Sequence, residues 1–231
     1  MSLPMLTDID SLPGSLAQRV YQALRGAILD MTFPPGTIVR KAVLCEQLGV
    51  SRSPVSEAIA RLASEGLLDV VPQSGTRVSR FSMEEIREET FLREAIEVAA
   101  AMRVARIRTE EQLTRLTRNL RLQELLVQDG DFMGFFEADE EFHALTLEFT
   151  GFPKVVAAAG TLSLQIKRAR ILLLPEEGRA AEAVAEHSAI LGAFRKGDPD
   201  AARSAMSAHL GQLISRIEPL ERRHPEFFRA R

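Results

Sequence analysis

Three of the four histidines in this chain lie among apolar residues at helical spacing, which indicates imidazoles inside a helical domain. They are His143, His187 and His209, and Asp139 precedes His143 by four residues, so both side chains project from one side of a helix. A carboxylate and three imidazoles can bind a divalent transition metal and still leave positions open for water or a ligand. A single histidine on such a face is more often a satisfied core residue, so the spacing alone leaves both interpretations open.

A second group of residues is typical of a helix that contacts DNA. In the segment 48–78, LGVSRSPVSEAIARLASEGLLDVVPQSGTRV, Ser51 or Ser53 can cap a helix and Pro54 falls in its first turn. The spacing predicts an apolar face of Val55, Ala58, Ile59 and Leu62. The opposite face carries small residues, including Ser53 and Ser56, with Arg52 at the N-terminal tip. Such a face can approach base edges closely and bind phosphate.

The flanking segments complete a winged helix-turn-helix over residues 14–80. An earlier helix has its apolar stripe at Leu16, Val20, Leu24 and Ile28, and a short second helix follows the turn Pro34-Pro35-Gly36. After Gly66, the residues 68–71 and 76–78 predict a two-stranded hairpin, the wing. The alternative is a small helical subdomain that binds protein.

The stretch PPGTIVRKAVLCEQLGVSRSPVSEAIARLASEGLL followed by SGTRV resembles the DNA-binding domain of GntR-family transcription regulators, over residues 16–79. The resemblance implies that Arg52, with Ser51 at the helix cap, contacts the operator and that Gly75 at the wing tip enters the minor groove. Ser56 stands where the family usually carries an arginine. The residues that could replace that contact are Arg40, Lys41, Arg61 and Arg77.

Charge and composition favour two domains and binding to DNA as a dimer. Residues 14–80 carry eight basic and five acidic side chains, a net charge of +3, and residues 81–231 carry 21 and 25, a net charge of −4. Because one weakly basic copy neutralises few phosphates, we expect a homodimer on a palindromic site. The chain has no apolar run of about 20 residues and no signal peptide, which predicts a cytoplasmic protein without a membrane partner.

After residue 80 the pattern is helical throughout, so the fold class is mainly α: the winged helix-turn-helix is followed by an antiparallel bundle of six or seven helices over 81–218. We expect residues 1–13 and 219–231 to be flexible ends. The predicted helices of the bundle cover 83–107, 110–127, 131–150, 154–174, 176–196 and 199–217.

The stretches LREAIEVAA, DEEFHALT and EHSAILGAFRKGDPDAARSAMSAHL resemble the metal-containing FCD ligand-binding domain of the FadR subfamily, across residues 91–210. The resemblance implies metal ligation by Asp139, His143, His187 and His209, and an Arg93 that faces the effector pocket. A surface pair of Arg93 with Glu97 is the alternative. Arg170 is a further candidate for an effector-binding cation. Phe152 stands where the family often has asparagine.

Three alternative functions are consistent with these sequence features. The first is a transcription regulator, not an enzyme, whose effector is a small organic acid bound to one divalent metal ion per chain, with Zn²⁺ favoured and Ni²⁺ or Mn²⁺ acceptable. The second is a metal-dependent hydrolase-type enzyme fused to a DNA-binding module, although the chain has no HExxH motif. The third is a repressor for which the ion itself is the signal.

Overall fold

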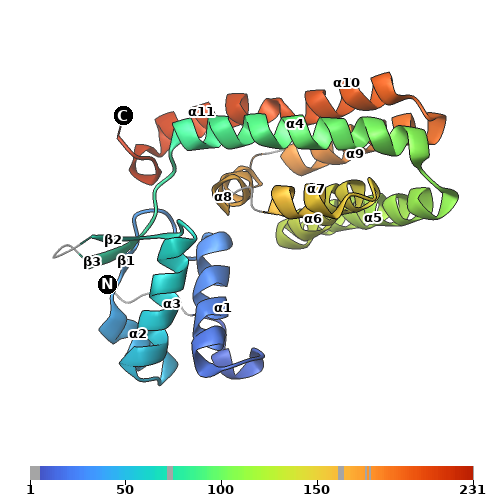
Figure 1. The fold of residues 1–231 in the computed structure, drawn as a ribbon. Coiled ribbons are helices and arrows are strands. Elements are labelled where there is room, and N and C mark those ends of the chain that lie inside the picture. Colours follow the sequence, from blue (N-terminus) through green and yellow to red (C-terminus); the bar gives the residue numbers. More distant parts are fainter. Residues whose placement is uncertain (1–5, 72–74, 161–163, 175, 177, 231) are drawn as a thin grey trace. The chain divides into compact units, whose positions relative to one another are not determined.

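The computed structural model describes residues 6–71, 75–160, 164–174, 176 and 178–230 (Figure 1). The chain forms two compact units. The first comprises Met1–Met83, Lys167–Ile171 and Leu220–Arg231, and the second comprises Glu84–Ile166 and Leu172–Pro219. The assignment differs from the sequence-based boundaries of 14–80 and 81–218 because two later segments belong to the first unit.

Three helices and a small sheet build the N-terminal part of the first unit. Ser15 caps the first helix by accepting from the Gln18 amide, and Gly49 ends the second with φ +63°, a conformation that favours glycine. The predicted apolar face of the third helix is buried, with Val55 and Leu62 fully inaccessible. The elements are η1 (Ile9–Ser11), α1 (Leu16–Leu29), α2 (Lys41–Leu48), α3 (Arg52–Ser64), β1 (Ile38–Val39), β2 (Leu68–Val71) and β3 (Gly75–Val78).

The sheet has one strand more than the predicted hairpin. Its order is β1-β3-β2, with both neighbours antiparallel to β3. Asp69 lies opposite Arg77 in the β2–β3 pair, and Ile38 lies opposite Arg77 in the β1–β3 pair. The sequence could not indicate β1, because two residues are too few to show an alternating pattern.

The C-terminal segment, which we expected to be a flexible end over 219–231, makes backbone hydrogen bonds and ring contacts within the first unit in the residues described. The Phe81 amide donates to the Phe227 carbonyl at 2.9 Å, and the Arg229 amide donates to the Phe81 carbonyl at 2.8 Å. Phe228 is buried and lies 5.3 Å from Phe81 between ring centroids. At the other end, residues 1–5 lie outside the described part, but Ile9 is buried within η1.

Arg168 is a fully buried cation of the first unit. Its guanidinium donates to the Ser79 carbonyl at 3.0 Å and lies 4.9 Å from the Phe81 ring centroid. Burial lowers the pKa of Arg168 to about 10, although Asp69 acts in the opposite direction. The segment Lys167–Ile171 is therefore fixed to the residues that follow the wing.

The second unit is built from antiparallel helices (Figure 1). The helices that follow the wing are α4 (Met83–Ile107), α5 (Glu110–Asp129), α6 (Phe132–Glu148), α7 (Pro153–Gly160), α8 (Leu164–Leu173), α9 (Arg179–Lys196), α10 (Pro199–Leu210) and α11 (Gln212–Arg223), with η2 (Pro225–Phe227) after them. A buried apolar cluster joins α4, α5, α6, α9 and α10, and includes Leu116, Phe142 and Phe194. Across the described residues, no helix combines the length and the apolar character that crossing a bilayer requires.

The helix boundaries follow the capping residues. Thr109 and Gln112 form a reciprocal capping box at the start of α5, and Asp198 caps α10 by accepting from the amides of Asp200 and Ala201. We expected six or seven helices, whereas the described residues place α4 to α11 after the wing. The predicted fourth helix corresponds to α7 and α8, and the sixth is divided into α10 and α11 at Gly211.

Candidate metal centre and nucleic-acid interface

Three histidines from different helices meet inside the second unit. His143 comes from α6, His187 from α9 and His209 from α10, all three are buried, and one ring nitrogen of each lies within 4.8 Å of the others. The Nε2 atoms of His143 and His209 are 3.2 Å apart. Asp139 Oδ1 lies 3.7 Å from His187 Nε2, and its Oδ2 lies 3.9 Å from His143 Nε2. The structure thus brings the three predicted histidine ligands together and places Asp139 beside two of them.

Each imidazole is oriented by an oxygen acceptor on its other nitrogen. His143 Nδ1 lies 2.5 Å from a carboxylate oxygen of Glu97, and His209 Nδ1 lies 2.6 Å from one of Glu186. His187 Nδ1 lies 2.7 Å from the amide oxygen of Gln123. An acceptor at Nδ1 places the proton there and directs the Nε2 lone pair inward, as the histidine ligands of metal sites require. The residues present therefore fit a divalent cation.

A further layer of charges holds these acceptors in place. Arg93 Nε donates to Glu97 at 2.6 Å, and both side chains are nearly inaccessible. Burial alone raises the pKa of Glu97, but the charge of Arg93 and the hydrogen bonds from Arg93 and His143 outweigh it and hold that pKa well below its usual range. Glu97 is therefore a buried carboxylate anion bonded to a metal-ligand candidate.

Glu186 has a similar environment. It is paired with Arg179 at 3.3 Å and accepts from Gln212 at 3.0 Å. Burial lowers the pKa of Arg179, and Glu186 opposes that shift. A stacked contact also fixes one ligand, because the rings of Phe142 and His187 lie 4.4 Å apart between centroids.

The orienting residues Glu97, Gln123 and Glu186 were not among the sequence-predicted site residues. The pair of Arg93 and Glu97 was visible at a spacing of four residues, but its alternative was a surface pair, and the structure shows that it is buried. Arg93 reaches the histidines through Glu97. Arg170 is half-buried on α8 and belongs to the first unit, so its role as an effector-binding cation stays a prediction.

The predicted DNA-contacting face of α3 is exposed. Arg52 is the first residue of the helix and is solvent-accessible, as is Ser53. Ser51 occupies the cap position but its side chain makes no capping hydrogen bond. Ser56 lies 3.4 Å from the ammonium group of Lys41 at the start of α2, so a cation from α2 lies beside the position where the family usually has arginine.

The other predicted cations of this face differ in their contacts. Arg40 is exposed at the cap of α2. Arg61 stacks 3.8 Å from the centroid of the Tyr21 ring and also contacts Gln18 and Glu65, so its guanidinium is engaged within the unit. On the wing, Gly75 begins β3 with φ +94°, and Arg77 is half-buried on the same strand. The wing tip, 72–74, lies outside the described residues.

Comparison with known families decides the class. Residues 16–78 match the model of bacterial regulatory proteins of the gntR family, and residues 89–212 match the FCD domain. The chain is a GntR-family transcription regulator with an FCD domain.

Relatives of this GntR-family regulator match over most of its length. The HTH-type transcriptional repressor RspR of Escherichia coli K12 is 30% identical over 91% of this chain and 92% of its own. A probable D-xylose utilization operon transcriptional repressor of Paenarthrobacter nicotinovorans is 26% identical over 87% and 88%. These relatives are transcription regulators, which makes this GntR-family protein a regulator and not an enzyme.

Solved structures share the fold of this regulator. E. coli McbR/YncC superposes with a TM-score of 0.73 at 22% identity, over 90% of this chain and 99% of that one. A putative GntR regulator from Rhodococcus sp. RHA1 gives 0.74 at 23% identity, over 89% and 99%. The likeness covers both the winged helix-turn-helix and the helical unit.

Proposed function

We propose that this regulator binds a palindromic operator as a homodimer, and that a small carboxylate bound at a divalent metal in the FCD domain controls its operator affinity. The convergence of His143, His187 and His209, each with an acceptor behind its Nδ1 atom, carries this proposal. A buried imidazole needs an acceptor for its N–H in any core. A core does not require three imidazoles to bring a second ring nitrogen together, as His143 and His209 do with Nε2 atoms 3.2 Å apart.

The ligands of the ion are Asp139, His143, His187 and His209. Three neutral nitrogen donors and one carboxylate favour Zn²⁺, and Ni²⁺ or Mn²⁺ can occupy the same set when they are more available. When bound, the ion supplies a Lewis-acidic centre with one or two coordination positions for an oxygen ligand.

A carboxylate effector suits the charges around this centre. It is a hard oxygen donor, and it compensates the charge that the single anionic ligand Asp139 leaves on a divalent ion. Glu97 and Glu186 carry negative charge, but Arg93 and Arg179 balance it through close ion pairs. Because Glu97 occupies only the Nε donor of Arg93, the terminal donors of that guanidinium can serve a ligand carboxylate.

The exposed apolar surface between α4 and α7 supports the homodimer. Phe91 is 71% exposed, Phe152 48% and Val156 40%, and no residue of α7 is buried. A hollow of about 450 Å³ lies between these helices, lined mainly by apolar side chains such as Ile96 and Val155. Exposed apolar surface of this extent is typical of an interface between subunits. We assign it to a second copy because the net charge of +3 on residues 14–80 calls for two DNA-binding units.

In this proposal α3 enters the major groove, and the wing enters the neighbouring minor groove through Gly75. Arg52 and Ser53 face the bases and phosphates at the N-terminus of α3. The remaining contacts come from Arg40, Lys41, Ser51, Ser56, Gly75 and Arg77. Arg61 is left out because Tyr21 and Glu65 hold its guanidinium.

The experiment is an operator titration by fluorescence anisotropy, with the binding site first selected from random duplexes. Metal-loaded protein is titrated with and without each member of a panel of hydroxy acids and sugar acids, and the titrations are repeated with His187→Ala. We expect one acid to change operator affinity for the loaded wild-type protein by at least tenfold, and to have no effect on the variant. An uncharged effector, or a carboxylate that acts equally on metal-free protein, would refute the proposal. A metal ion that releases DNA without any acid would instead identify a metal sensor.

A further inference from the structure

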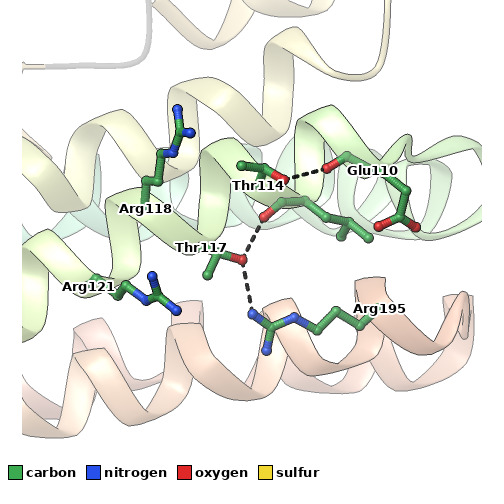
Figure 2. Close-up of a pocket in the computed structure, with 7 residues that line it drawn as sticks. Glu110, Thr114, Thr117, Arg118, Arg121 and Arg195 are labelled. Atoms are coloured by element: carbon green, nitrogen blue, oxygen red, sulfur yellow. Dashed lines mark hydrogen bonds between the residues drawn. The ribbon is translucent and has the colours of Figure 1, made fainter.

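A polar cavity lies between α5 and α9, and none of the four metal-ligand candidates lines it. Its volume is about 540 Å³, and residues of α5 together with Arg195 of α9 line it (Figure 2). Three arginines contribute to the lining, whereas Glu110 is its single carboxylate. The cavity therefore carries a net charge of +2 in a region, residues 81–231, whose net charge is −4.

Hydrogen bonds fix one of these arginines on the wall. Arg195 donates to the Thr117 hydroxyl at 2.9 Å, and Thr117 in turn donates to the Leu113 carbonyl at 2.6 Å. These hydrogen bonds occupy one N–H donor of the Arg195 guanidinium and leave its other N–H donors available. In Figure 2, Thr117 lies between Arg121 and Arg195, and the guanidinium of Arg118 points away from these two.

Arg118 and Arg121 make no hydrogen bond or ion pair with any residue that the structure describes, and both are exposed. Their neighbour Arg115, on the same helix, behaves differently: it donates to Glu148 at 2.9 Å. Most arginines near the cavity would be expected to find such a partner in a domain with excess carboxylates. The cavity is instead lined by guanidinium groups whose N–H donors face solvent.

We propose that this cavity is a binding site for a phosphate group, either free or as part of a phosphorylated small molecule. Two guanidinium forks from facing helices can bind the oxygens of a tetrahedral dianion, and the net charge of +2 matches that dianion. The concave, small-molecule-sized shape favours a compact ligand over an extended polyanion. This site is separate from the metal centre and extends the proposed function.

A ligand in the cavity would bridge α5 and α9, and these two helices also carry the hydrogen bond that orients the metal-ligand candidate His187. Gln123 on α5 accepts from His187 on α9, two residues along α5 from Arg121. A phosphate bridging Arg121 and Arg195 would strengthen the α5–α9 pair. We therefore expect phosphate to stabilise the protein against heat as well as to bind it.

The test is isothermal titration calorimetry of the full-length protein with inorganic phosphate and with glycerol 2-phosphate, the second distinguishing a phosphorylated molecule from the free ion. We expect saturable binding of one of them, with a dissociation constant of about 1 mM or below. Arg121→Gln and Arg195→Gln should each weaken it by about tenfold, since each removes a charge-assisted contact. Arg195→Lys, which keeps the charge but loses the fork, should retain part of the affinity.

Arg203→Gln is the matched control, because Arg203 is an exposed arginine of the same unit paired with Asp200. It should leave phosphate binding unchanged. The proposal would be overturned if phosphate binding did not saturate, or if Arg203→Gln weakened it as much as Arg121→Gln does. Phosphate binding that requires the added metal ion and is unaffected by Arg121→Gln and Arg195→Gln would place the phosphate at the metal centre instead. A reduced affinity of Arg121→Gln for duplex DNA of unrelated sequence would make the cavity a nucleic-acid contact and equally overturn it.

Discussion

Replacing Glu97 by glutamine should weaken metal binding although Glu97 is not itself a proposed ligand. Its carboxylate accepts from His143 Nδ1 at 2.5 Å and from Arg93 at 2.6 Å, in a position that is 4% exposed. A glutamine keeps the size of the side chain and one oxygen acceptor but removes the negative charge. The substitution therefore separates the electrostatic contribution of Glu97 from its packing.

The size of the effect follows from the kind of hydrogen bond that is lost. A bond to a charged acceptor stabilises by about 1.5–3 kcal/mol, and a bond between neutral groups by about 0.5–1.5 kcal/mol. The difference of roughly 1–1.5 kcal/mol corresponds to about tenfold in affinity. That lies at the lower end of the roughly 10–100-fold losses typical when a residue behind a metal ligand is changed.

The assay is competition for Zn²⁺ against a chromophoric chelator, at fixed pH, with wild-type protein and the variant. Glu88→Gln, an exposed position on α4, is the matched control and should bind the ion as the wild type does. Circular dichroism and the melting temperature of the variant must show that it is folded. Equal affinity of a folded Glu97→Gln variant and the wild type would refute the orienting role of Glu97, and a wild type that binds no ion would refute the metal centre itself.

Three further predictions concern the ion, the operator and the buried arginine. At a free Zn²⁺ concentration of about 100 times its dissociation constant, binding should stabilise the protein by about 2.7 kcal/mol and raise the melting temperature by roughly 5–11 °C; an unchanged melting temperature on chelation would contradict this. Arg52→Ala should weaken operator binding by about 1–3 kcal/mol without unfolding the protein. If Arg52 contacts a phosphate, the substitution should also reduce the slope of log affinity against log salt concentration by about 1. If Arg52→Ala kept the operator affinity and the salt dependence of the wild type, Arg52 would not be part of the DNA interface. Arg168→Ala should lower the free energy of unfolding by about 3 kcal/mol through the lost Ser79 bond and the cavity left behind, measured by denaturant titration beside Lys167→Ala; a change below about 0.5 kcal/mol would show that Arg168 contributes no net stability.

Local periodicity was sufficient to predict most helices. The predicted span 83–107 coincides with α4, and capping residues gave the starts of α5 and α10 correctly. The buried face of α3 followed from its apolar spacing in the same way. These features depend on residues within a few turns of each other, which a single sequence displays directly.

The positions of side chains beyond one helix were less predictable. Arg61 has the type and exposure of a DNA-contacting residue, yet Tyr21 and Glu65 hold it. The last residues of the chain are polar and basic, yet Phe228 is buried beside Phe81. In both cases the partner lies on another element, and its contact with the residue depends on packing that no local pattern encodes.

The sequence by itself determined that Asp139 and His143 share a helix face and that His187 and His209 lie on apolar faces of other helices. Tertiary structure alone decided that their nitrogens meet, and which residues stand behind them. The decisive pairs, Glu97 with His143, Gln123 with His187 and Glu186 with His209, are separated by 46, 64 and 23 positions along the chain. Helical periodicity fixes the direction of a side chain relative to its own axis, but only the packing of one helix on another fixes the distance between two side chains.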